Sequence, residues 1–139
     1  MRHKALLLFT FCSLMLMVSC THWRETAGEI AGMWQMTEWR NADGQTLATQ
    51  ANGIYYCIQL DLMKFQRKDK EDYYLSYYTH ARDSLIIGKI VHWPSDTVGF
   101  YSDLASFGVP ADGRFHVDVL NDDHLQLSSK EATLVFRRY

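Results

Sequence analysis

The chain has 139 residues, with 14 Lys and Arg against 16 Asp and Glu and a formal net charge of −2. This length predicts one domain around a single core. No basic stripe of the kind that nucleic-acid-binding proteins carry is visible, so the charge pattern argues against a nucleic-acid partner.

Residues 1–19 have the layout of an export signal. Arg2 and Lys4 make a basic start, and residues 5–18 are an apolar run without an acidic residue. The run is shorter than the roughly 20 residues that a spanning helix needs, so it predicts a cleaved signal peptide. Cleavage after residue 19 leaves 120 residues, with 12 basic residues against 16 acidic ones and a net charge of −4.

The segment Met17-Val18-Ser19-Cys20 resembles a bacterial lipobox, with Met17 where Leu is usual. In that family the cysteine thiol receives a diacylglyceryl group, the signal is cut before it, and the new amine is acylated. The resemblance implies that lipid on Cys20 anchors the protein in a Gram-negative envelope, in the outer membrane, with the periplasmic or surface face left open. Such acylation makes attachment effectively permanent. The alternative is an ordinary secretory signal that ends near a cysteine.

The cysteines leave no disulfide for the folded part. Cys12 departs with the signal and Cys20 is taken by lipid, so Cys57 has no intramolecular partner. The polar, unpatterned residues 20–29 predict a tether, and residues 30–139 predict a domain held by packing alone.

From residue 30 onward, short runs of alternating or aromatic residues predict one strand after another. The expected strands are residues 32–39, 54–65, 73–80, 83–93, 115–119, 125–127 and 134–136, with a short one at 97–101. The expected reversals are residues 41–44, 67–72, 121–123 and 128–130, with a capped helical turn at 102–107 closed by Gly108. The run 54–65 is the longest predicted strand, and its even positions form one apolar face.

Many short strands with almost no helix predict an all-β fold. We expect an antiparallel up-and-down barrel of about eight strands, because closing a strongly twisted sheet removes its exposed edges. A sandwich is the alternative.

The segment Ile30-Ala31-Gly32-Met33-Trp34 resembles the Gly-x-Trp opening of lipocalin and calycin barrels, and residues 115–138 resemble the closing hairpins of small bacterial lipocalin-like lipoproteins. The resemblance implies that Trp34 plugs one end of the barrel and that Arg137 or Arg138 packs over it. It also implies transport or storage of small apolar molecules, as in some members. The long helix that many lipocalins carry has no counterpart here. The chain is also shorter than a full lipocalin, so we expect a barrel that is either shallow or filled by its own side chains.

Aromatic residues are the strongest functional lead. Trp39, Tyr56 and Tyr77 are the candidates for lining the open end, because rings with a polar tip suit a mouth that holds an amphipathic ligand. Cross-strand aromatic packing, which stabilises any sheet, is the alternative interpretation.

Catalytic and metal-binding patterns are weak. The sequence has no Gly-x-Ser-x-Gly elbow, no His-Glu-x-x-His pair and no phosphate-binding glycine loop. His116 and Asp118 share a strand face, with His124 across a turn, but an outward polar face explains them more simply than a metal site. We expect neither an enzyme nor a cofactor.

The sequence thus predicts a lipid-anchored, non-catalytic barrel that binds a small apolar or amphipathic ligand. The rival hypothesis is an accessory lipoprotein whose barrel is filled and whose outer aromatics bind a protein partner. The packing of the interior discriminates the two.

Overall fold

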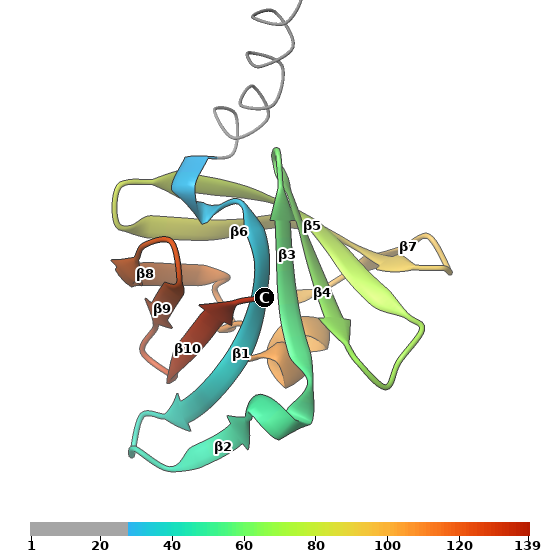
Figure 1. The fold of residues 1–139 in the computed structure, drawn as a ribbon. Helices are drawn as coiled ribbons and strands as arrows, with labels where there is room; N and C mark the ends of the chain where they lie inside the picture. The colour runs from blue at the N-terminus through green and yellow to red at the C-terminus, as the bar shows by residue number, and fades with distance from the viewer. Residues whose placement is uncertain (1–27) are drawn as a thin grey trace, which may run out of the picture.

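A computed structural model describes residues 28–139 (Figure 1). The predicted signal peptide, the lipid site Cys20 and most of the predicted tether lie outside the described residues. The elements are η1 (Gly28–Ile30), β1 (Gly32–Asn41), β2 (Thr46–Thr49), η2 (Gln50–Asn52), β3 (Ile54–Gln59), β4 (Leu62–Arg67), β5 (Tyr73–Ala81), β6 (Ser84–Trp93), β7 (Thr97–Gly99), η3 (Tyr101–Phe107), β8 (Arg114–Leu120), β9 (His124–Ser128) and β10 (Ala132–Arg138).

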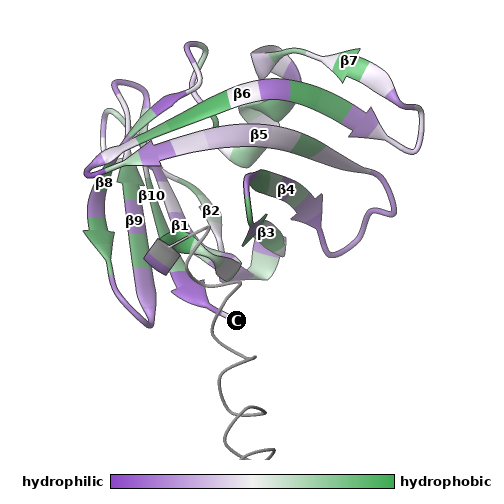
Figure 2. Cartoon of the chain, turned by 90° about the horizontal axis from the view of Figure 1, so that it is seen from above, coloured by the Kyte–Doolittle hydropathy of each residue, from purple (hydrophilic) through white to green (hydrophobic). Residues whose placement is uncertain are grey.

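Eight strands form a closed antiparallel ring in the order β1-β3-β4-β5-β6-β8-β9-β10, and β10 pairs with β1 to complete it. The short strands β2 and β7 pair with the C-terminal parts of β1 and β6, respectively. Figures 1 and 2 show the strands arranged around a common axis. The predicted antiparallel barrel of about eight strands is therefore confirmed over the sandwich.

The core lies inside this ring because alternate residues of each strand point inward. One continuous cluster of buried side chains runs through the barrel from η1 to η3. Its largest fully buried members are Trp34, Tyr56, Phe65, Phe136, Met36 and Met63.

The predicted long strand 54–65 is wrong. It is divided into β3 and β4 by a turn at Leu60 and Asp61, where Leu60 has a left-handed φ of 55°. The turn changes which residue numbers face inward, so Ile58 is buried before it and Met63 after it. A leucine at this position hides the turn, because glycine and asparagine are the usual residues there.

Two smaller differences have similar causes. Strand β2 was not predicted, since its segment lacks a clear apolar alternation. Val119 continues the alternation of Phe115 and Val117, but a bulge between Val117 and Val119 leaves it exposed.

Helix η3 covers one end of the barrel. Asp103 accepts the backbone N–H of Phe100 at 2.7 Å, and Gly108 ends the helix with a left-handed φ of 84°. Its side chains Leu104 and Phe107 are buried in the core cluster. Within residues 28–139, no helix has the length and apolar character needed to cross a bilayer.

Candidate functional site

One end of the barrel, here called the closed end, is sealed by Trp34. The indole ring of Trp34 is fully buried, and its Nε1 donates to the Ile30 carbonyl at 2.8 Å. The Arg138 guanidinium lies 4.1 Å from the ring centroid, a cation–π distance. Its nitrogens donate to the backbone carbonyls of Ala31 at 2.7 Å, Glu29 at 3.2 Å and Asp122.

Gly32 makes this closure possible. Its φ is 141°, and a Cβ at this position would lie 2.2 Å from Nη1 of Arg138. The positive φ is the main reason for glycine here, since that clash would involve only the flexible end of the Arg138 side chain.

Arg137 points to the opposite face of β10. Its Nε and Nη2 donate to Oε1 of Gln35 at 2.8 and 2.7 Å, and Gln35 donates to the Tyr55 hydroxyl at 3.0 Å. Of the two arginines that the sequence left open, Arg138 is the one that lies over Trp34.

The three aromatic candidates do not converge. Tyr56 lies in the core, with its ring centroid 4.7 Å from those of Phe65 and Phe136. Its hydroxyl donates to the Phe107 carbonyl at 2.7 Å, and burial raises the pKa of Tyr56 well above its ordinary value of 10.0. Tyr77 is 54% exposed on the outer face of β5.

Trp39 is the remaining candidate, and it packs against the core cluster from β1. Its cross-strand neighbours are Ala48 and Leu134, both buried. In the part of the chain that the structure describes, its indole N–H is buried without a hydrogen-bond partner. Trp39 and Tyr56 therefore reach the interior, whereas Tyr77 does not.

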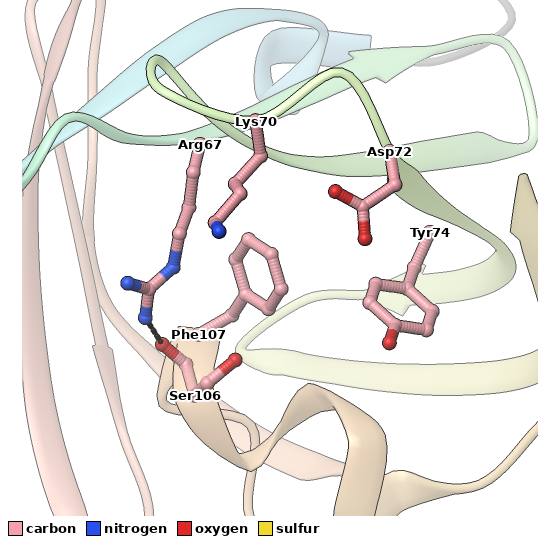
Figure 3. A pocket seen from close by; sticks show the side chains of 6 residues that line it. All are labelled: Arg67, Lys70, Asp72, Tyr74, Ser106 and Phe107. Atoms are coloured by element: carbon pink, nitrogen blue, oxygen red, sulfur yellow. Dashed lines mark hydrogen bonds between the residues drawn. The ribbon is translucent and has the colours of Figure 1, made fainter.

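At the other end of the barrel, here called the mouth, a recess of about 330 Å³ opens between the β4–β5 loop and η3 (Figure 3). It is lined by Arg67, Lys70, Asp72, Tyr74, Ser106 and Phe107. Figure 3 shows the Phe107 ring between these groups, with the Lys70 amine pointing toward it. The recess thus has an aromatic floor and a polar rim.

The rim is partly fixed by its own contacts. Arg67 donates to the Ser106 carbonyl at 2.8 Å, which ties η3 to the end of β4. Asp72 lies 3.3 Å from Nε2 of His92. Within residues 28–139, Lys70 forms no salt bridge, so its charge is available to a ligand.

Tyr74 is the second ring of the floor. Its centroid is 4.7 Å from that of His92 and 6.0 Å from that of Phe107. Burial, followed by the carboxylates of Asp103 and Asp72, raises the pKa of Tyr74 above its ordinary value of 10.0, so it stays a neutral hydroxyl donor. The sequence interpretation missed this site because it took residues 67–72 for a solvated reversal.

The closed antiparallel ring, with a Gly-x-Trp first strand and an arginine over the tryptophan, defines the class of calycin-type barrels. The chain belongs to the lipocalin-like domain family, whose profile matches residues 14–139. The lipocalin-like fold is generally a binding fold rather than a catalytic one, and it supports a ligand-binding barrel.

Solved structures with the same fold come from several bacteria. A lipocalin-like protein from Bacteroides uniformis is 21% identical with a TM-score of 0.60, covering 81% of this chain and 100% of its own. An uncharacterized protein from Bacteroides eggerthii is 25% identical with a TM-score of 0.54, covering 78% of this chain and 98% of its own. A protein from Burkholderia xenovorans is 18% identical with a TM-score of 0.53, covering 78% of this chain and 81% of its own. No curated protein matches the chain.

Proposed function

We propose that this protein is a lipid-anchored binding protein of the Gram-negative envelope that takes a small amphipathic anion at the mouth of its barrel. The observation that carries the proposal is the recess over Phe107 and Tyr74, which combines an aromatic floor with the amine of Lys70, a cation without a salt bridge among residues 28–139. The protein acts by binding and needs no cofactor.

The packed interior supports a ligand at the mouth rather than deep inside. Trp34, Tyr56, Phe65 and Phe136 are fully buried along the barrel. The Tyr56 hydroxyl already donates a hydrogen bond to the Phe107 carbonyl. An apolar tail would therefore lie across the rings at the mouth, and its charged head would reach the rim.

The charge of the rim supports an anionic head group. Arg67 and Lys70 outnumber Asp72, which is also shared with His92. A carboxylate near Lys70 gains a charge-assisted hydrogen bond that a neutral hydroxyl does not.

Lys70→Gln tests this part of the proposal. We expect the protein to bind a medium-chain fatty acid more tightly than the alcohol of equal length, as measured by calorimetry. Lys70→Gln should weaken only the acid, by about fivefold, which corresponds to roughly 1 kcal/mol for an exposed ion pair. Lys68→Gln, in the same loop but outside the recess, is the matched control. Equal affinity of the wild-type protein for acid and alcohol would contradict the proposal.

Cys20 supports the anchor, because it directly follows a signal-like segment that ends in Met17-Val18-Ser19. Cys20→Ser should leave unprocessed precursor and abolish labelling by radioactive palmitate. Labelling that persists in this variant would exclude Cys20 as the lipid site.

A protein partner is the second candidate function, and exposed apolar side chains near β7 favour it. Trp93, Val98 and Phe100 are all exposed, although they are large and hydrophobic. A photo-crosslinking residue at Phe100 should give one defined adduct in intact cells, whereas the same residue at exposed Leu47 on β2 should not. Identical patterns from both positions would remove this alternative.

A further inference from the structure

We propose that a corner at the closed end, formed by Met33, Leu60 and Leu62 and here called the apolar corner, rests on the lipid bilayer in the anchored protein. The inference rests on the proposed lipid anchor at Cys20. It concerns a second, non-covalent contact with the membrane that would orient the barrel.

The apolar corner is an exposed hydrophobic surface on the outside of the barrel. Met33 is 37% exposed, Leu60 45% and Leu62 37%. They line a shallow outer recess of about 580 Å³ together with Gly32, Cys57, Ile58, Gln59, Lys64 and Leu75. The outer face of an antiparallel barrel is ordinarily polar, so an apolar recess here is a candidate contact surface.

Leu60 is held in an unusual conformation. Its φ of 55° lies in the left-handed region. This region is unfavourable for L-residues that carry a Cβ, and glycine or asparagine usually occupies it. The Tyr78 hydroxyl fixes the turn by donating to the Leu60 carbonyl at 2.7 Å. Since nearly half of the Leu60 side chain remains exposed, core packing does not account for a leucine at this position.

The N-terminal chain leads to the same corner. Gly32 pairs in register with Ile58, two residues before Leu60. Figure 1 shows η1 and the tip of the β3–β4 hairpin at the same end of the barrel. Seven residues lie between Cys20 and Gly28, so eight Cα-to-Cα steps join them. They span at most about 29 Å at roughly 3.6 Å per residue, so a lipid on Cys20 keeps this end close to the bilayer.

Charges around the apolar corner favour a zwitterionic lipid surface over an anionic one. Lys64 lines the recess, but its amine lies 4.1 Å from the centroid of the Tyr73 ring, which is outside the recess. Asp61 shares the turn with Leu60. On the other turns of this end, Arg82 and Asp83 oppose each other in charge, and Asp122 and Asp123 add two carboxylates. With no excess of cations, contact depends on the apolar side chains, and anionic lipid should not strengthen it.

The test uses the processed, lipidated protein reconstituted in phosphatidylcholine vesicles. Cys57→Ser removes the native thiol, and Leu60→Cys then takes a polarity-sensitive dye. We expect a blue-shifted emission and several-fold stronger quenching by spin-labelled lipid than for the same dye at Asp43→Cys. Asp43 lies in the β1–β2 turn at the other end of the barrel. A second label at Leu62→Cys gives an independent reading if the turn variant unfolds.

Each outcome has one meaning. Equal, weak quenching at positions 60 and 43 in protein with lipid on Cys20 would overturn the apolar corner and leave the anchor standing. A mass spectrum without lipid on Cys20 would overturn the anchor, and the inference that rests on it. A blue shift that appears without vesicles and grows with protein concentration would assign the corner to a second copy of the chain instead.

Discussion

The two ends of the barrel are closed in different ways. At the closed end, Trp34 and Arg138 direct their polar atoms to backbone carbonyls of the chain itself. At the mouth, η3 is held by Tyr56 and Arg67, while the charges of Lys70 and Asp72 face the recess.

This difference separates stability from binding. At the closed end, the indole N–H of Trp34 is satisfied, and each nitrogen of the guanidinium that covers its ring donates to a backbone carbonyl. These polar groups are thus committed to contacts within the chain. At the mouth, the Lys70 amine forms no salt bridge within the described part of the chain and lies over aromatic rings, so it can bind a ligand. The rim can be altered without opening the core. Variants at the closed end should therefore change the free energy of unfolding, and variants at the rim should change affinity.

Trp34→Ala should have the largest effect. Emptying a large, fully buried aromatic site costs about 3–5 kcal/mol, and Arg138 loses its partner ring at the same time. Urea unfolding followed by circular dichroism measures the loss. A decrease below about 1 kcal/mol would mean that Trp34 does not seal the barrel.

Tyr56→Phe should have the next largest effect and should act at the mouth. The ring stays, but the Phe107 carbonyl loses its only side-chain donor among the described residues, which costs about 1–3 kcal/mol when the group is left unsatisfied in the core. Amide exchange should rise in η3 and at Val109 more than in β9 and β10. Tyr77→Phe, at the exposed tyrosine, is the control and should leave both measurements unchanged. Uniform exchange throughout the barrel would mean that Tyr56 does not fasten η3.

Much of the fold could be predicted because burial follows strand periodicity. Leu125 and Leu127 in β9, and Leu134 and Phe136 in β10, are buried as their alternation indicates. The turn at residues 41–44 follows directly from its residue types, with Gly44 at a positive φ of 81°.

The remainder was hidden for physical reasons. Leu60 has the left-handed φ of a turn residue, but leucine is not a residue type that predicts a turn. No local sequence signal therefore marks the end of β3. The recess at the mouth is made by the β4–β5 loop and η3, which strands β5, β6 and β7 separate in the sequence. Only closure of the ring brings Lys70 and Phe107 together.

Leu60→Gly should give a smaller effect of opposite sign. Glycine accepts a φ of 55° without a clash, so the free energy of unfolding should rise by about 1 kcal/mol. Leu62→Gly, in the strand beside it, should be destabilising and serves as the matched control. A loss of stability in Leu60→Gly would show that the leucine side chain stabilises the turn by packing.

At the closed end, the pairing of β6 with β8 can be compared with the contacts around Trp34. It is one of the shortest hydrogen-bonded ladders in the ring of strands. Only Ser84 to Ile86 pair with Arg114 to His116. Beside it, His116 lies between two carboxylates, with Nδ1 at 2.8 Å from Asp118 and Nε2 at 3.0 Å from Asp83. A neutral imidazole has one N–H and cannot donate to both, so this arrangement requires the imidazolium.

This cluster predicts the smallest effect, a loss of stability at alkaline pH. The hydrogen bond to Asp118, and then that to Asp83, raise the pKa of His116 above its ordinary value of 6.5 despite some desolvation. The stabilisation that His116 gives to the folded state is therefore complete below pH 6.5, where the unfolded chain also binds the proton. It disappears as the pH rises through the pKa of the folded state. Urea unfolding from pH 5.5 to 8.5 should show this decrease, whereas His116→Asn should not. An imidazole chemical shift that titrates at or below pH 6.5 would contradict the bridging role, because two accepting carboxylates must favour the charged ring.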